Sequence, residues 1–114
     1  MLKLTCLPKR RPGLTQAEFV AHHKEVHAPL FAANPSAKQH LVRYILSHPL
    51  AEQPQGLPNA GFDAVVEFWF KSAQAIQALF SDPYYLSNVR PDELRFMDME
   101  GSRFLLTQET IVIA

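Results

Sequence analysis

The sequence predicts an α+β protein with a ferredoxin-like fold, in which a four-stranded antiparallel sheet carries both helices on one face. Four segments have the apolar or alternating pattern of strands, and two have the 3.6-residue period of amphipathic helices. Their order along the chain is strand, helix, strand, strand, helix, strand. The 114 residues are enough for one domain, spanning residues 1–114, and too few for two.

The N-terminal segment predicts a strand followed by a basic turn. Residues 2–7 form a short apolar run, and Pro8 closes it. Residues 9–13, Lys-Arg-Arg-Pro-Gly, contain a Pro-Gly turn signal. We therefore expect the first strand to end before this basic loop.

The first helix is bounded by capping and helix-breaking residues. Thr15 and Glu18 match a capping box, in which each side chain accepts a hydrogen bond from the backbone of the other, so the helix should begin near Gln16. Pro29 and the Asn-Pro-Ser cluster at residues 34–36 should end it.

The centre of the chain predicts two strands joined by a long connection. Residues 40–48 and 62–71 have the strand pattern, and residues 49–61, rich in proline and glycine, predict a loop that can act as a lid. The alternation divides the third strand between two faces, and the sequence leaves open which of them meets the helices. One face holds Phe62, Ala64, Val66, Phe68 and Phe70, and the other holds Asp63, Val65, Glu67 and Trp69.

The C-terminal part predicts the remaining helix and strand. A serine caps a helix over residues 72–80. Pro83 and Pro91 each suit the first turn of a further short helical piece. Gly101 interrupts the pattern, and residues 103–113, rich in Leu, Ile, Val and Thr, predict the fourth strand.

A sheet that carries helices on one face leaves its other face uncovered. The third and fourth predicted strands have apolar residues on both faces. In a chain this short, a second copy is the simplest cover, so we expect a homodimer that forms through the open sheet face.

Composition excludes several classes of partner. Eleven basic and eleven acidic residues cancel, which argues against nucleic-acid binding and against attachment to an anionic membrane. No apolar stretch approaches the ~20 residues of a membrane helix, and the N-terminus lacks a signal-peptide pattern. Cys6 is the only cysteine, so no disulfide forms within the chain, as suits a cytoplasmic protein. The scattered glycines form no phosphate loop, so we expect no bound organic cofactor.

Two histidines occupy positions of the first helix where apolar residues are expected. At 100° per residue, Phe19, His23, Val26, His27 and Leu30 share one face, and the apolar members mark that face as buried. The two histidines therefore point inward together. Histidine titrates near neutrality, so a buried one can carry protons or bind a ligand.

Four stretches of the chain resemble the EthD family of the dimeric α+β barrel superfamily. They are residues 9–15, residues 19–30 with their Val-His-Ala-Pro-Leu ending, residues 63–70 (Asp-Ala-Val-Val-Glu-Phe-Trp-Phe), and Tyr44 with His48. The resemblance implies a homodimer with a shared barrel and a pocket between helices and sheet in each subunit. Related folds include muconolactone isomerases, polyketide cyclases, cofactor-free monooxygenases and haem enzymes.

The sequence departs from the family pattern at one position of the first helix. His22 and His27 match the pattern, but His23 stands where the family usually has Trp. A bulky aromatic wall is thereby replaced by a second ionisable group.

Our candidate catalytic residues are His27, Glu67 and Asp63. A buried imidazole at position 27 can take a proton from carbon or oxygen and return it elsewhere. Glu67 and Asp63 share a face of the third strand, and a carboxylate there can orient the imidazole if that face meets the helices. The alternative is a structural histidine, with Glu67 paired to Arg43 or Arg103 inside the dimer barrel.

Our candidate substrate-binding residues are His23, Tyr44, His48 and Trp69. Tyr44 can donate a hydrogen bond to an enolate or phenolate oxygen, and His48 shares its strand face. Trp69 would form part of an aromatic wall. His23 and His27 also have the i, i+4 spacing of helical metal ligands, but without an HExxH motif we predict no metal site.

These features together predict a small cofactor-independent enzyme. It would act on an apolar cyclic or aromatic molecule that bears a carbonyl group, by proton transfer through a histidine. Isomerisation, cyclisation and dehydration fit that chemistry, and cofactor-free oxygenation of an activated phenol ranks next. The alternative is a non-catalytic homodimeric protein that binds a small molecule or assists another enzyme. The sequence does not name the substrate.

Overall fold

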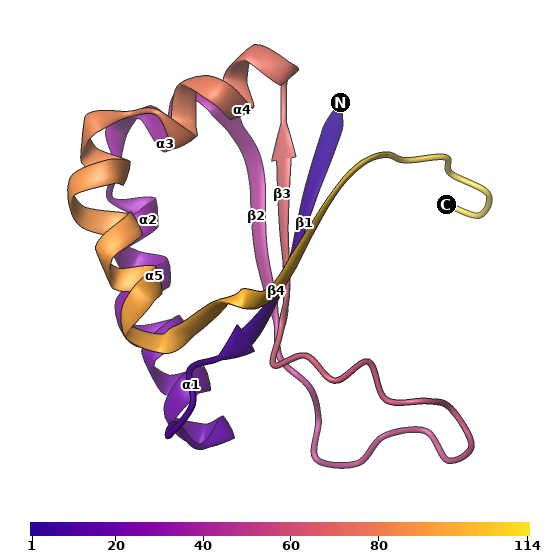
Figure 1. The fold of residues 1–114 in the computed structure, drawn as a ribbon. Helices are drawn as coiled ribbons and strands as arrows, with labels where there is room; N and C mark the ends of the chain where they lie inside the picture. Colours follow the sequence, from indigo (N-terminus) through magenta and orange to yellow (C-terminus); the bar gives the residue numbers. More distant parts are fainter.

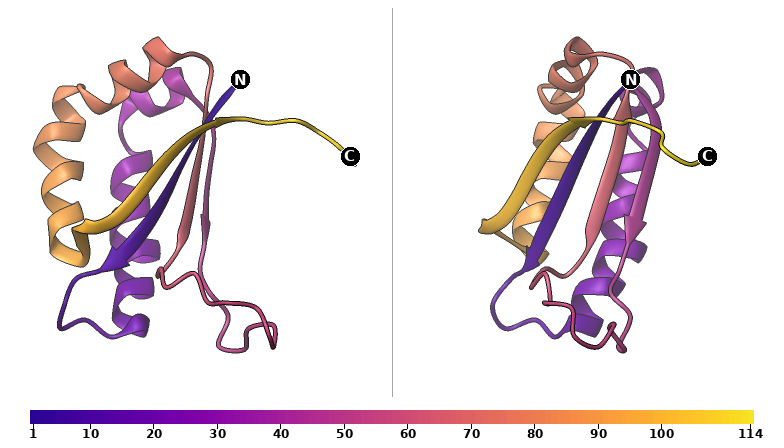
Figure 2. Two further views of the ribbon diagram at one scale, coloured as in Figure 1. Left: turned by 45° about the vertical axis from the view of Figure 1, so that its right-hand side comes forward. Right: turned by 90° about the vertical axis from the view of Figure 1, so that its right-hand side faces the viewer.

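The computed structural model describes all residues from 1 to 114, and its four strands form one antiparallel sheet. The strands are β1 (Leu2–Arg10), β2 (Leu41–Ser47), β3 (Val65–Phe70) and β4 (Met97–Gln108), arranged in the order β2-β3-β1-β4 (Figure 2). Figure 1 shows every helix on the same side of this sheet. The predicted ferredoxin-like α+β fold is confirmed.

The helical layer consists of two runs, each with one π-helical turn in its middle. The first contains α1 (Gln16–His22), the π turn η1 (His23–His27) and α2 (Ala28–Ala32), and is followed by α3 (Pro35–His40). The second contains α4 (Ala73–Phe80), the π turn η2 (Tyr85–Val89) and α5 (Arg90–Phe96). The capping box of Thr15 and Glu18 is present at the start of α1, as predicted.

Pro29 does not end the first helix, contrary to our expectation. The backbone N–H of Ala28 bonds five residues back, to the carbonyl of His23, and the helix continues to Ala32. A proline lacks an N–H and crowds the carbonyl four residues before it, and the wider π turn relieves this crowding. The same arrangement recurs where the N–H of Arg90 bonds to the carbonyl of Tyr85, just before Pro91.

The edge pairing of β1 and β4 is longer than the sequence patterns predicted. β1 continues through Pro8, because Lys9 and Arg10 pair with β4 beyond a bulge. β4 accordingly begins at Met97 instead of residue 103 and includes Gly101. A β-carbon at Gly101 would lie 2.7 Å from the carboxylate of Asp98, so a larger residue here would displace that side chain.

The ends of two strands also differ from our predictions. β4 ends at Gln108, and residues 109–114 extend beyond the sheet (Figure 1). β3 begins at Val65, so the connection from β2 is longer than expected and projects away from the helical layer (Figure 1). No helix in the structure is both long enough and apolar enough to cross a membrane.

The face of β3 that meets the helices is the more apolar one. Ala64, Val66, Phe68 and Phe70 are all buried beneath the helical layer. Glu67 and its neighbours of the same parity therefore turn toward the open side of the sheet. The alternation of the strand residues did not indicate which face meets the helices, and the burial of these four side chains identifies it.

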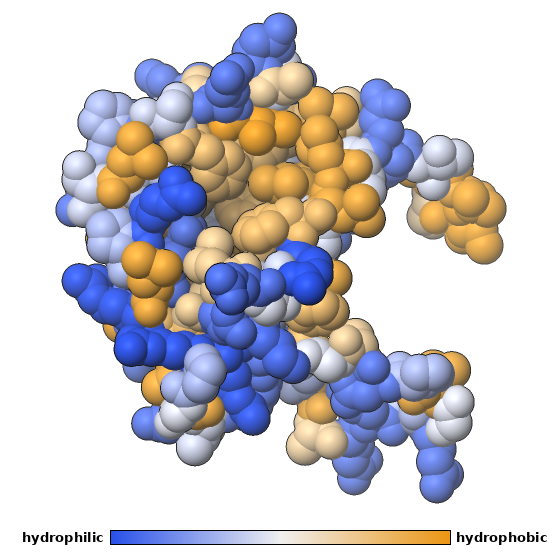
Figure 3. Space-filling model, viewed as in Figure 1, coloured by the Kyte–Doolittle hydropathy of each residue, from blue (hydrophilic) through white to orange (hydrophobic).

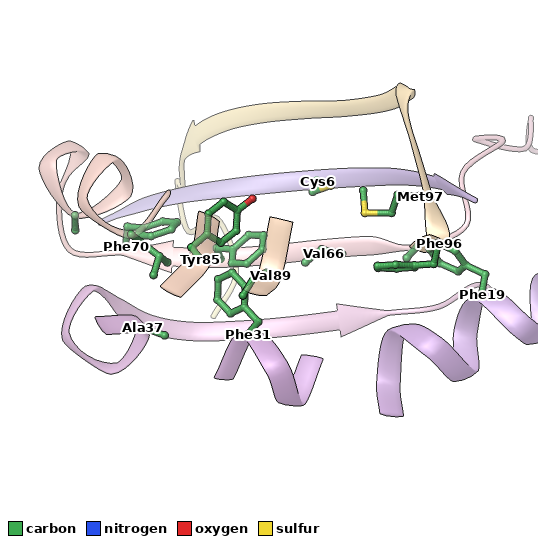
Figure 4. Close-up of a cluster of buried hydrophobic side chains, with 14 residues drawn as sticks. Cys6, Phe19, Phe31, Ala37, Val66, Phe70, Tyr85, Val89, Phe96 and Met97 are labelled. Carbon is green, nitrogen blue, oxygen red and sulfur yellow. The ribbon is translucent and has the colours of Figure 1, made fainter. Parts of the chain in front are cut away.

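The core side chains form two groups along the strands. Figure 4 shows Phe19 and Phe96 at one end and Phe31, Phe70 and Tyr85 at the other. The Phe19 and Phe96 rings lie 5.2 Å apart, and Phe31 contacts the Tyr85 ring at 6.4 Å, edge to face. The two groups fix the helical layer at both ends of the sheet.

We predict that Phe70→Ala lowers the free energy of unfolding by about 3–5 kcal/mol, because this fully buried ring would leave a cavity in the core. Denaturant titration would measure the change. Val112→Ala, in the exposed C-terminal segment, should alter stability by no more than about 0.5 kcal/mol. Equal effects of the two substitutions would contradict the packing described above.

Candidate active site

A cavity of about 380 Å³ lies between the helical layer and the sheet. Figure 3 shows it as a hollow surrounded mainly by hydrophobic side chains. Its size falls within the range of ligand-binding pockets. The residues that line it are Leu4, Cys6, Pro8, His23, His27, Phe31, Tyr44, Val66, Phe68, Phe80, Tyr85, Arg90, Glu93, Met97, Met99 and Phe104.

The π turn η1 places His23 and His27 on the wall of this cavity. Both side chains are buried, with exposed fractions of 2% and 6%. The ring of Phe96 lies 4.8 Å from that of His27 and 5.3 Å from that of His23. The burial predicted for these two histidines is thus present, but Val26, placed on the same face by the helical period, is 46% exposed. π turns are frequent at functional sites.

His27 is held by a carboxylate from the opposite helix. Its Nδ1 lies 2.9 Å from Oδ2 of Asp92, which is 1% exposed and sits in the first turn of α5. An ionised carboxylate only accepts hydrogen bonds, so Nδ1 carries the proton and donates it to Asp92. The other ring nitrogen, Nε2, is then unprotonated and available as a base.

Asp92 receives two further hydrogen bonds. His22 Nε2 donates to its carboxylate at 3.0 Å, and Arg95 donates to Oδ1 at 3.3 Å. Burial by itself raises the pKa of Asp92, but the bonds from His27, His22 and Arg95 outweigh it and bring the pKa below its ordinary value. The carboxylate is therefore ionised at neutral pH.

The same environment keeps His27 neutral. Burial lowers the pKa of His27, and the bond and charge of Asp92 offset that effect only in part. Neutral His27 beside ionised Asp92 is the arrangement that a general base needs before it receives a proton.

His23 interacts with a histidine from the end of the second strand. Its Nδ1 lies 2.9 Å from Nε2 of His48, and the two rings are nearly perpendicular at 5.0 Å. Burial, followed by the nearby His48, His27 and His22, lowers the pKa of His23 to about 3. His23 thus presents a neutral polar group to the cavity.

Tyr85 and Glu93 form a second polar pair on the cavity wall. The Tyr85 hydroxyl donates to Glu93 Oε2 at 2.7 Å. Burial raises the pKa of the Glu93 carboxyl, although Tyr85 and Arg90 act in the opposite direction. The cavity wall therefore holds a carboxyl group in addition to the two histidines.

The structure does not bring Glu67 or Asp63 to His27, contrary to the pairing that we considered. Glu67 lies on the open face of the sheet and binds Lys3 Nζ at 3.0 Å. Asp63 accepts a hydrogen bond from the backbone of Arg10 at 2.7 Å, at the end of β1. Both carboxylates are held by cations or amides away from the cavity.

Trp69 also lies outside the cavity. Its indole N–H donates to Glu109 at 2.7 Å, and Arg43 lies over its ring at 4.9 Å. It shares the open face with Glu67. Trp69 therefore does not form part of an aromatic wall of this cavity.

Tyr44 and His48 have different surroundings. Tyr44 lines the cavity with its ring stacked on Phe68 at 4.9 Å, and burial raises the pKa of its hydroxyl. His48 does not line the cavity but contacts it through His23, beside the loop that follows β2. Of the candidate residues, His23, His27 and Tyr44 are thus brought to one cavity.

Asp92 and Glu93 were missed by sequence reasoning. They follow Arg90-Pro91 in the first turn of a helix, where acidic residues commonly stabilise the N-terminus. Nothing in the neighbouring sequence distinguishes Asp92 and Glu93 from ordinary acidic residues at the start of a helix. No group of three His, Cys, Asp or Glu side chains in the structure is arranged to hold a metal ion.

A family model described as the EthD domain matches residues 11–100. This span includes the histidine helix, the strands β2 and β3, and the Asp92–Glu93 helix. The chain therefore belongs to the EthD family, as the four matching stretches indicated.

Two similar curated proteins are named dehydratases. The conidial pigment biosynthesis dehydratase EthD of Metarhizium robertsii is 30% identical over 111 residues, which cover 90% of this chain and 78% of that protein. Dehydratase aurZ of Gibberella zeae is 29% identical over 109 residues, covering 87% and 70%. These relatives support an enzymatic function for this chain.

Solved structures share the fold at lower sequence identity. An EthD family protein from Bacillus halodurans has a TM-score of 0.70 at 20% identity, with 96% of this chain and 99% of that chain covered. SnoaB, a cofactor-independent oxygenase from Streptomyces nogalater, has a TM-score of 0.61 at 15% identity, with 98% and 97% covered.

We predict that the protein loses stability as the pH falls from about 6.5 toward 3. The pKa of His23 is about 3 in the folded state and near 6.5 in the unfolded chain, so between these values only the unfolded state binds the proton. His23→Gln should flatten the slope by up to about 1 kcal/mol per pH unit, as measured by denaturant titration at pH 7, 6 and 5. Gln77→Ala, on the exposed side of α4, should keep the wild-type slope, and an unchanged slope in His23→Gln would contradict the assignment.

Proposed function

We propose that this protein is a small dehydratase that works without a bound organic cofactor. In this proposal it removes a proton from the carbon next to a carbonyl group and eliminates a hydroxyl group from the neighbouring carbon. The observation that supports it most is the His27–Asp92 pair on the wall of an apolar cavity. Proton transfer of this kind requires only correctly placed acids and bases.

His27 would act as the general base. Its Nε2 takes the proton from carbon, and Asp92 stabilises the imidazolium that forms, as an orienting carboxylate does in other enzymes. The electrons of the broken C–H bond form an enolate, which then expels the β-hydroxyl group. Tyr44 is a candidate donor to the enolate oxygen, because it lines the same cavity.

The lining of the cavity favours a flat, largely apolar substrate. Phe31, Tyr44 and Phe68 present aromatic rings on one side, with Tyr44 and Phe68 nearly parallel at 9°. Aromatic rings of this kind stack on planar ligands. A cyclic or aromatic ketone with a β-hydroxyl group fits both this lining and the proton-transfer chemistry.

We also propose that two copies pack through the open sheet face. Val65 and Leu105 are exposed there, by 39% and 63%, beside the charged pair of Lys3 and Glu67. Phe104 is 54% exposed although it lines the cavity, so one side of the cavity is incomplete in a single subunit. A second copy on the open face would cover Val65 and Leu105.

His27→Gln should lower kcat/KM by about 10²–10⁴-fold, because the general base is lost. A suitable probe is 3-hydroxy-1-tetralone, a β-hydroxy ketone whose dehydration gives the fluorescent product 1-naphthol. Asp92→Asn should lower kcat/KM as well, because the imidazolium loses its counter-charge. His40→Gln, the same exchange in α3, is the matched control and should retain full activity.

Full activity of folded His27→Gln would contradict the catalytic role. A wild-type protein that binds 1-naphthol but does not dehydrate the ketone would favour the alternative, a non-catalytic small-molecule-binding or accessory protein.

For the homodimer, Leu105→Glu should convert the protein to a monomer, since it places like charges on the two facing sheets. Light scattering coupled to size-exclusion chromatography would measure the mass. Leu94→Glu, at a similarly exposed position on α5, should remain dimeric. A wild-type monomer at micromolar concentration would contradict the proposed interface.

A further inference from the structure

The eliminated hydroxyl group needs a proton, and His27 does not hold one when the reaction begins. Neutral His27 has its single ring proton on Nδ1, committed to Asp92. Hydroxide is a poor leaving group and must be protonated as the C–O bond breaks, either by the imidazolium of His27, which Asp92 stabilises, or by a second residue. That residue must line the cavity and carry a proton at neutral pH.

We propose that Glu93 is this second catalytic residue and donates a proton from its carboxyl group to the departing hydroxyl, which leaves as water. This inference rests on the proposed dehydratase function. Each turnover breaks one C–H bond and one C–O bond and forms one C=C bond. His27 gains a proton and Glu93 loses one, so a proton then returns from His27 to Glu93 through water.

Glu93 is placed to act separately from its neighbour Asp92. Consecutive residues of a helix differ by about 100° in direction. Asp92 accordingly contacts the histidines of the first helical run, whereas Glu93 lines the cavity and meets η2. The structure thus holds two adjacent carboxyl groups in two different environments.

Tyr85 fixes the Glu93 carboxyl group in an orientation suited to a donor. The Tyr85 hydroxyl donates to Oε2, and Oε1 has no hydrogen-bond partner within the protein. No buried side-chain oxygen or nitrogen lacks a partner, so Oε1 is an accessible atom. Because Glu93 lines the cavity, a group bound there is within reach of that oxygen.

The groups around Glu93 favour its protonated form. Burial raises its pKa, and the negative charge of Asp92 adds to this, while Tyr85 and Arg90 lower it. Cys6 and Tyr44 also line the cavity and carry protons, but burial raises the pKa of each, to about 12 for Cys6, so both are weak acids that release a proton less readily than a carboxyl group. Asp92, a carboxyl group whose pKa is lowered, beside Glu93, one whose pKa is raised, is the division of roles found where one site performs acid and base chemistry.

The test compares two leaving groups in the same cavity. 3-Hydroxy-1-tetralone must lose a protonated hydroxyl, whereas 3-acetoxy-1-tetralone loses acetate, which leaves as an anion without a proton. Both give 1-naphthol. Glu93→Gln keeps an acceptor for the Tyr85 hydroxyl but has no proton to donate.

We expect Glu93→Gln to lower kcat/KM on the hydroxy ketone by about 10²–10³-fold and on the acetoxy ketone by less than about 5-fold. His27→Gln should lower kcat/KM by the same large factor on both, since each elimination begins with the loss of the carbon-bound proton. Glu25→Gln, at an exposed position of η1, is the matched control and should match the wild type on both.

The outcomes separate this inference from the proposed function. Equal losses of Glu93→Gln on both substrates would make Glu93 a structural or positioning residue and overturn the inference, as would the absence of any loss. If His27→Gln remains active or the wild type dehydrates neither compound, the proposed function itself fails.

Infrared spectroscopy with a ¹³C-labelled glutamate carboxyl gives a readout of the protonation of Glu93 without turnover. A protonated band at neutral pH that disappears in Glu93→Gln supports the inference, and its absence contradicts it.

Discussion

The arrangement of the cavity depends on one buried carboxylate, Asp92. It accepts hydrogen bonds from His27 and His22 on the first helical run and from Arg95 on its own helix. A buried carboxylate without such partners would be strongly destabilising. Asp92 therefore joins the two halves of the helical layer and at the same time determines which nitrogen of His27 carries the proton.

The two π turns shape the cavity around this interaction. Each immediately precedes a proline-containing helix, and each presents polar side chains to the cavity: His23 and His27 from η1, and Tyr85 from η2. The widened turns are compatible with the missing proline N–H groups. Pro29 and Pro91, each just after a π turn, thus accompany a cavity wall on which acid and base groups face an otherwise apolar space.

Most of the fold could be predicted from the sequence, because it follows from local periods and caps such as the Thr15 capping box. The inward direction of His23 and His27 follows from the helical period in the same way. The predicted strands were too short where pairing between distant segments determines their length, as for Lys9 and Arg10, which pair with β4.

The site could be predicted only in part, because its remaining members are brought together by tertiary structure. Asp92 is 65 residues from His27 in the sequence and resembles an ordinary helix-start residue. The pattern of strand three correctly separated its two faces, but a period of two contains no information on which face meets the helices. The sequence therefore allowed Glu67 as a partner for His27. The burial of Phe68 beneath the helices shows that Glu67 faces the opposite side of the sheet.

The proposed chemistry of the cavity depends on His27 being a neutral base with its proton on Nδ1. Nitrogen NMR of ¹⁵N-histidine-labelled protein at pH 7, with His27→Gln for assignment, measures this directly. We expect a neutral imidazole for His27, with Nδ1 protonated and Nε2 unprotonated. An imidazolium, or a neutral ring with the proton on Nε2, would contradict it.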